Sequence, residues 1–141
     1  PNRRLLVASA DYARRFGLPQ RPKDIAAHRV GVVRENRADA SLWLLTGPGG
    51  IEMNLRVKPV FGCNDGEVLH AWALDGFGIV ERSEWSVSSD LRVGRLVRVL
   101  PDWSLPDADI VALLNPRSVR SLRIDKFVER LASEISAPPM A

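Results

Sequence analysis

The residues of this sequence best suited to chemistry by type and spacing are Asn64, Asp65 and Gly66, at the expected start of a helix. They follow a short apolar run, Val60–Cys63, and asparagine is a favoured N-cap residue. Glu67 stands three residues after Asn64, so the pair can form a capping box. The first amides of a helix have no helical partners, and glycine has no side chain to keep a ligand away. We therefore predict that the amides of residues 65–67 can bind an anion.

This predicted anion site is weak by itself. A helix terminus contributes about 0.3–2 kcal/mol toward an anion, whereas millimolar binding already needs about 4 kcal/mol. A second wall must therefore close over the helix start before a ligand is held. Two other interpretations stay open. One is a capped helix whose amides meet only water, and the other is a hairpin turn at Asp65-Gly66, which the helical period of the following residues disfavours.

Catalytic and metal sites have less support. Cys63, Asp65 and His70 superficially resemble parts of a nucleophilic site, but the cysteine and the histidine are roughly 10 Å apart along the expected helix. We expect His70 to be a surface or interface residue and Cys63 to pack beside the helix start. The two histidines and the single cysteine lack metal-ligand spacing, so we predict no metal, no cofactor and no catalytic residue.

Four tryptophans are a second source of ligand-binding side chains. Tryptophan more often packs in a core or beneath a loop than stacks on a ligand, and packing is the favoured interpretation here. Trp43 is the one that we retain as a candidate for a side chain facing a ligand.

The composition is that of a globular domain of ordinary size. The 141 residues include 45% hydrophobic and 26% charged side chains, with a net charge of +3. Acidic residues are interleaved with the arginines, which argues against a nucleic-acid footprint, and no apolar run approaches the roughly 20 residues of a membrane span. A single cysteine excludes an internal disulfide and fits a reducing compartment. Because the chain starts at Pro1 and almost at once enters a strand, we expect it to be part of a longer protein.

Short apolar runs that alternate with helical patterns predict an α/β fold with an at least partly parallel sheet. Residues 3–8 have the composition of a parallel strand, and a helical turn follows from Ser9. Leu42–Leu45 and Ile51–Leu55 flank a glycine-rich turn and predict a hairpin with one wet face. The other expected elements are helical turns over 22–28, strands over 29–33, 60–63, 78–80, 95–100 and 110–114, a helix from Asn64 to a left-handed exit at Gly76, a short helix over 81–87 capped by Ser83, and a final helix capped by Ser121.

Several segments resemble, in order and spacing, the effector-binding domain of LysR-type transcriptional regulators. Arg4–Ser9 followed by Asp11-Tyr12 resembles the family's LVAS-x-x-Y entry, and Asn64–Glu67 followed by Ala73–Ile79 is similar to its NDG-x-x-L…AL-x-G-x-GI stretch. The likeness covers nearly the whole chain and continues through Gly17–Ile25, Ser83–Trp85, Gly94–Trp103 and the last helix. The chain departs from the pattern at Glu81-Arg82, where many members have Leu-Pro, and at Ala10 and Leu122, where proline is common.

The resemblance implies a fold like that of type 2 periplasmic binding proteins, in which two α/β lobes enclose a ligand cleft. It places residues 9–110 in a nearly complete lobe two, and residues 1–8 and 111–141 in the crossing strands and part of lobe one. It also implies that the rest of lobe one, and an N-terminal winged helix-turn-helix, lie outside this sequence.

The function implied by this resemblance is sensing of a small-molecule effector, a small carboxylate or other anion, in the cleft between the lobes. The cleft wall would contain Asn64, Asp65 and Gly66, with Ser9 at the hinge and Trp43 as a further candidate. We expect a cytoplasmic regulator that is not an enzyme, does not touch a membrane, reaches DNA only through its N-terminal domain, and forms a homo-oligomer (dimer or tetramer) when complete. A solute-binding protein of a transport system with the same fold is the alternative, and an enzyme that uses Cys63 is the third possibility.

Overall fold

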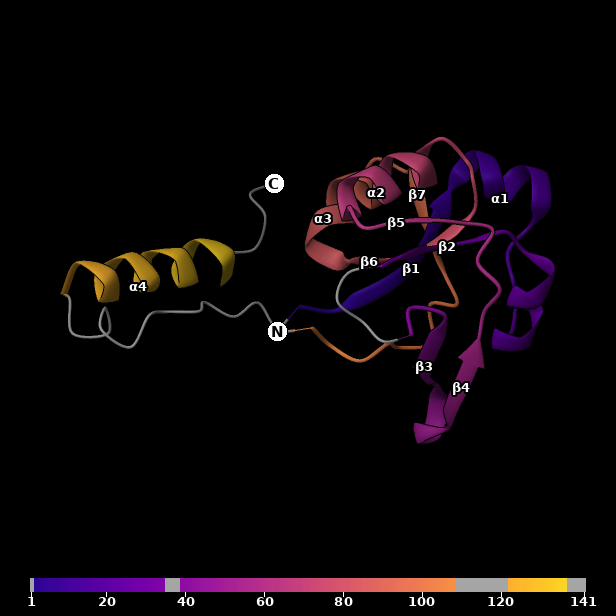
Figure 1. Ribbon diagram of the computed structural model, residues 1–141, viewed down its shortest axis with the longest axis horizontal. Helices are drawn as coiled ribbons and strands as arrows, with labels where there is room; N and C mark the ends of the chain where they lie inside the picture. Colours follow the sequence, from indigo (N-terminus) through magenta and orange to yellow (C-terminus); the bar gives the residue numbers. More distant parts are fainter. Residues whose placement is uncertain (1, 35–38, 109–121, 137–141) are drawn as a thin grey trace. The chain divides into compact units, whose positions relative to one another are not determined.

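The structure is a computed structural model that describes residues 2–34, 39–108 and 122–136, and it forms two compact units, residues 1–109 and 110–141 (Figure 1). The first unit begins with β1 (Arg4–Ser9), α1 (Ala10–Phe16), the 3-10 helix η1 (Pro22–Ala27), β2 (Val30–Val33), β3 (Leu42–Thr46), the 3-10 turn η2 (Pro48–Gly50) and β4 (Glu52–Arg56). It continues with β5 (Phe61–Cys63), α2 (Gly66–Leu74), β6 (Ile79–Ser83), α3 (Glu84–Arg92) and β7 (Leu96–Val99). The second unit contains α4 (Leu122–Ser136).

A five-stranded sheet of order β5-β2-β6-β1-β7 organises the first unit. β2 is parallel to β5 and β6, whereas β1 is antiparallel to both β6 and β7. The α/β fold with a partly parallel sheet is therefore confirmed, but the parallel pairing predicted for residues 3–8 is wrong. β1 lies in the middle of the sheet and is buried on both faces, so its apolar run is the same whichever way the neighbouring strands point.

The two faces of this sheet have different covers. Leu5, Val7 and Val80 pack against Leu69 of α2 and Val87 of α3. Alternate residues point the other way and form a second core with the hairpin and the η1 segment; its members include Leu6, Ala8, Ile79, Tyr12, Ile25, Trp43 and Leu45. Figure 1 shows α2 and α3 on one side of the sheet and the β3–β4 hairpin on the other. The edge of the sheet at which β5 ends therefore lies near both the start of α2 and the base of the β3–β4 hairpin.

The hairpin predicted around the glycine-rich turn is confirmed. β3 and β4 pair antiparallel, with Leu45 opposite Met53, and form a separate two-stranded sheet. In β4, Met53 and Leu55 are half-buried while the residues between them are exposed, so one face is wet as expected.

The second unit, taken alone, contains the final helix that the apolar period predicts. α4 carries Phe127 and Leu131 on its apolar side, and both are exposed. The predicted cap Ser121 and the predicted strand 110–114 lie outside the described residues, and the assignment of residues 9–110 and 111–141 to two lobes stays a prediction. No helix among the described residues is long and apolar enough to cross a bilayer.

Candidate functional site

One edge of the five-stranded sheet, which we call the carboxyl edge, collects the carboxyl ends of β5, β2, β6 and β7. The amino end of β1 lies at the same edge, because β1 runs antiparallel and Arg4 is opposite Ser83. In open α/β sheets, ligands bind outside the carboxyl ends of the strands. The side chains that the topology brings here come from the segment 64–66 after β5, from Arg34 after β2, from Arg82 near the end of β6 and from Arg4 of β1.

The start of α2 lies at the carboxyl edge, but its cap is one residue later than predicted. Asp65 is the N-cap, and its Oδ1 accepts hydrogen bonds from the Glu67 amide at 2.8 Å and the Val68 amide at 3.3 Å. The predicted Asn64 cap and its box with Glu67 are therefore wrong. Asparagine and aspartate are about equally good caps, but only the aspartate adds a negative charge at the positive end of the helix dipole.

This cap changes which amides a ligand can use. Of the three amides predicted to be open, that of Glu67 is bonded to Asp65. The amides of Asp65 and Gly66 have no hydrogen bond to any residue that the structure describes. The helix start therefore offers fewer donors than expected, and two carboxylates, those of Asp65 and Glu67, stand beside them.

A cation pairs with one of those carboxylates, that of Glu67. The guanidinium of Arg82 lies against Gly66, where an added Cβ would come within 2.8 Å of Arg82 Cζ. Arg82 Nη2 donates to Glu67 Oε1 at 3.1 Å, while the buried Arg82 Nε has no hydrogen-bond partner in the described part of the chain. The helix predicted over 81–87 begins only at Glu84, so Arg82, which was not among the candidate site residues, lies in β6. The signal that could have found it was the departure from Leu-Pro at Glu81-Arg82.

A pocket of about 640 Å³ opens between the end of β2 and the base of the hairpin. Its lining includes the cations Arg34, Arg56 and Lys58 and one carboxylate, Asp39, whose Oδ2 accepts from Arg56 Nη1 at 2.6 Å. The hydrogen bond from the Ser41 hydroxyl, and then that from Arg56, hold the pKa of Asp39 below its usual value. The pocket thus has an excess of positive charge, which favours anions.

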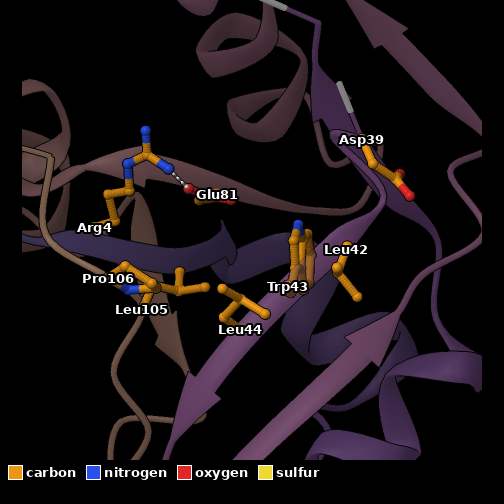
Figure 2. A pocket seen from close by; sticks show the side chains of 8 residues that line it. All are labelled: Arg4, Asp39, Leu42, Trp43, Leu44, Glu81, Leu105 and Pro106. Atoms are coloured by element: carbon orange, nitrogen blue, oxygen red, sulfur yellow. Dashed lines mark hydrogen bonds and ion pairs between the residues drawn. The ribbon is translucent and has the colours of Figure 1, made fainter. Parts of the chain in front are cut away.

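A second, smaller pocket of about 270 Å³ contains the candidate Trp43 in its wall (Figure 2). Figure 2 shows Arg4 and Glu81, joined by an ion pair of 2.6 Å, on one side and Trp43 between Leu42 and Leu44 on the other. Only 1% of Trp43 is exposed, and it packs in the core under the hairpin. Its contacts are therefore mainly structural, although the residue also lines this pocket.

The structure does not bring Ser9 together with residues 64–66. Ser9 ends β1 at the opposite edge of the sheet, where it is opposite Leu96. Its Oγ accepts the Tyr12 amide at 3.0 Å and caps α1, so the predicted helical turn from Ser9 is confirmed. Gly76, beyond the far end of α2, is its neighbour, since a Cβ there would lie 3.4 Å from Ser9 Oγ. A hinge role for Ser9 stays a prediction.

The expectation that His70 is a surface or interface residue is wrong. Its exposed fraction is 8%, and its Nε2 lies 2.8 Å from Oδ2 of the buried Asp90 on α3. Arg95 also pairs with Asp90. His70 thus links α2 to α3 as a packing residue. No group of three or more potential metal ligands is found among the described residues.

Comparison with known protein families finds a match over nearly the whole chain. Residues 1–136 match the model described as the LysR substrate binding domain. The chain is 34% identical over 132 residues to the HTH-type transcriptional activator TtdR of Escherichia coli (strain K12), and 34% identical over 130 residues to the HTH-type transcriptional regulator DmlR of the same strain. These alignments cover 94% and 92% of this chain but only 42% of each relative, so the chain spans less than half of their length.

Solved structures with the same fold include a regulatory domain and a LysR-type transcriptional regulator. The regulatory domain of AphB from Vibrio vulnificus superimposes with a TM-score of 0.78 at 23% identity, over 94% of this chain and 64% of that domain. The LysR-type regulator CrgA from Neisseria meningitidis gives a TM-score of 0.76 at 24% identity, over 96% of this chain and 46% of that protein. At these identities the likeness establishes the fold.

Proposed function

This chain belongs to the LysR substrate-binding domain family, as its sequence motifs predict, and from that premise we propose that it is the effector-sensing part of a LysR-type DNA-binding transcriptional regulator. Its fold is that of LysR regulatory domains, which are like type 2 periplasmic binding proteins. The relatives are transcriptional regulators, so a transport protein of the same fold is not favoured. The same relatives support our proposal that the chain is not an enzyme and acts in the cytoplasm.

We propose that the effector is a small carboxylate or other anion, bound against the carboxyl edge with residues 64–66 in the wall. The observation that carries this proposal is the position of that segment, beside the carboxyl ends of β2 and β6. The end of β2 also lines a pocket with excess positive charge. A helix start contributes at most about 2 kcal/mol, and millimolar binding needs about 4 kcal/mol, so side chains near the helix start and the other lobe must supply the remaining contacts.

The proposed mechanism is a shift between two populations of the complete regulator. An effector that touches both lobes binds the closed form more tightly than the open form, and so it can move the equilibrium only by that difference in affinity. Closure would change how the subunits of a dimer or tetramer pack, and thereby how the N-terminal winged helix-turn-helix domains meet DNA. A helix-turn-helix region encoded upstream of this sequence would support this role, whereas a signal peptide there would support transport.

The test is a thermal-shift screen of the full-length regulator with acetate, benzoate, succinate, glutarate and citrate, each beside its uncharged amide. A ligand that binds only the folded state adds about 2.7 kcal/mol of stability at a concentration of 100 Kd. We expect at least one carboxylate, and not its amide, to raise the unfolding midpoint. A response to amides alone, or to none of the five acids, would contradict a carboxylate effector.

A variant of Gly66 tests the position of the site. Gly66→Leu should abolish the response without unfolding the protein, because its Cβ would fall where the Arg82 guanidinium lies and would force that flexible side chain aside. Ser89→Leu places the same side chain at an exposed position of α3 and serves as the control. An unchanged titration with Gly66→Leu would count against this site.

A further inference from the structure

We propose that Arg82 is the residue that recognises the carboxylate of the effector, and that Glu67 occupies the Arg82 guanidinium until the effector replaces it. This inference rests on the proposed function and names the residue that reads the ligand within the same site. It begins from a difference between two arginines at the carboxyl edge. Arg3 makes two hydrogen bonds to its carboxylate partner, whereas Arg82 makes only one to Glu67.

Arg3 shows what a complete pair looks like in this molecule. Its Nε donates to Glu84 Oε2 and its Nη2 to Glu84 Oε1, each at 2.6 Å, so both carboxylate oxygens accept from one edge of the guanidinium. Such bidentate pairs are the preferred geometry between arginine and a carboxylate, and they add specificity to the charge attraction. Glu84 thus leaves no donor on that edge of Arg3 unsatisfied.

Arg82 presents the same edge with one donor unused. Nη2 donates to Glu67 Oε1 at 3.1 Å, but Nε is buried and has no partner among the described residues. The Arg82 side chain keeps only 11% of its surface exposed, whereas that of Glu67 keeps 73%. A buried polar donor without a partner is unfavourable, and a buried charge requires close pairing. A carboxylate that enters in place of Glu67 can satisfy Nε and Nη2 together.

The start of α2 explains why a cation is needed here at all. Asp65 has already capped the Glu67 and Val68 amides, so the helix itself has little left to offer an anion. Arg82 lies next to the positive end of the helix dipole, where a cation gains nothing from that dipole. The guanidinium is therefore held in an unfavourable place by burial and by a single exposed partner, which is the arrangement expected of a group kept ready for an incoming anion.

Gly66 is part of the same arrangement. The Arg82 guanidinium fills the space in which any other residue would place its Cβ, with Cζ at 2.8 Å from that position. The role predicted for Gly66, to let a ligand approach the helix start, is thus taken by the arginine side chain. Glu67 can leave Arg82 without losing every basic neighbour, because His70 Nδ1 lies 4.0 Å from Glu67 Oε2.

Replacing Arg82 should weaken carboxylate binding and replacing Glu67 should strengthen it. If the ion pair were merely structural, the two replacements would not have opposite effects on the affinity. The measurement is calorimetric titration of the full-length regulator with whichever of the five carboxylates raises its unfolding midpoint most. Arg82→Gln should weaken binding at least tenfold, and Arg82→Lys should recover little, because lysine cannot make a planar bidentate pair. Glu67→Gln should tighten binding between two- and tenfold, since it removes the competing carboxylate. Glu84→Gln, which breaks the matched pair with Arg3, should leave the affinity unchanged.

The outcomes separate this inference from the proposed function. If the unmodified regulator binds a carboxylate but Arg82→Gln and Arg82→Lys bind it within twofold of that affinity, Arg82 does not read the ligand and only this inference fails. If Glu67→Gln binds the carboxylate more weakly than the unmodified regulator does, Glu67 does not compete with the effector for Arg82. Because Glu67 is exposed, this variant is informative even if the Arg82 variants do not fold. If no carboxylate binds the unmodified regulator, the carboxylate effector itself is wrong.

Discussion

Truncation of Trp43 should cost far more stability than truncation of any exposed tryptophan. Its exposed fraction is 1%, and it packs with Leu45 and Tyr12 on the hairpin side of the sheet. Removing a buried tryptophan side chain costs about 3–5 kcal/mol, because apolar contacts are lost and a cavity remains. Against the 5–15 kcal/mol that typically separates folded from unfolded domains, Trp43→Ala should remove about a fifth or more of the stability.

The size of the effect can be expressed as a shift in melting temperature. For a unit of this size, 1 kcal/mol corresponds to about 4 °C. Trp43→Ala should therefore lower the midpoint by about 12–20 °C. Trp85→Ala is the matched control, because Trp85 lies on α3 with an exposed fraction of 64%, and its loss should stay within about 0.5 kcal/mol. Urea denaturation of both variants, followed by far-ultraviolet circular dichroism, gives the two free energies.

Two results would refute this reasoning in different ways. If Trp43→Ala loses less than about 1 kcal/mol, the burial of the indole does not stabilise the hairpin against the sheet as its packing implies. If it keeps its stability but loses the thermal response to a carboxylate, Trp43 faces the ligand through the pocket in Figure 2. The expected result, a large loss of stability, assigns Trp43 to the core.

The cap of α2, the buried histidine and one carboxylate give three further expectations. Asp65→Ala should cost about 1 kcal/mol in urea denaturation, and Asp65→Ser only a fraction of that, because serine keeps the cap. His70→Leu should cost about 1–3 kcal/mol, since Asp90 loses a buried partner, and hydrogen exchange should show faster opening of α2 and α3. The lowered pKa of Asp39 means that its charged form favours folding above its ordinary pKa and that this contribution is lost as the pH falls through the lowered value. Asp39→Asn should therefore flatten the acid side of a stability profile measured against pH.

The helix at the centre of the chain could be predicted from sequence because several local signals agree. The strand before it, the left-handed exit at Gly76 (φ 77°) and the strand after it are all present. The cap itself could not be predicted to the residue, because Asn64 and Asp65 are adjacent and both are good caps. That shift of one residue matters for function, since it commits the Asp65 carboxylate to amides that a ligand would otherwise use.

The direction of the strands and the long-range neighbours of their residues could not be predicted from the sequence, for a different reason. An apolar run such as β1 records that both of its faces are buried, and it does not record which way the adjacent strands run. The antiparallel direction of β1 is what puts Arg4 at the carboxyl edge and Ser9 at the opposite one. A motif that is contiguous in sequence, with Ser9 as its last residue, therefore contributes its two ends to different edges of the sheet.

Arg82 shows where local patterns reach their limit and where a departure from a family pattern becomes informative. Its position over Gly66 depends on β6 and α2 packing at one edge, so neither segment alone indicates that the two residues meet. Yet a positive charge in place of an apolar residue, at the end of a buried strand, destabilises a folded domain unless an opposite charge or a hydrogen-bond acceptor pairs with it. The exposed Glu67 carboxylate balances it in part by accepting one hydrogen bond from Arg82. The Nε of Arg82, which has no partner among the described residues, is the donor that remains for a ligand to satisfy.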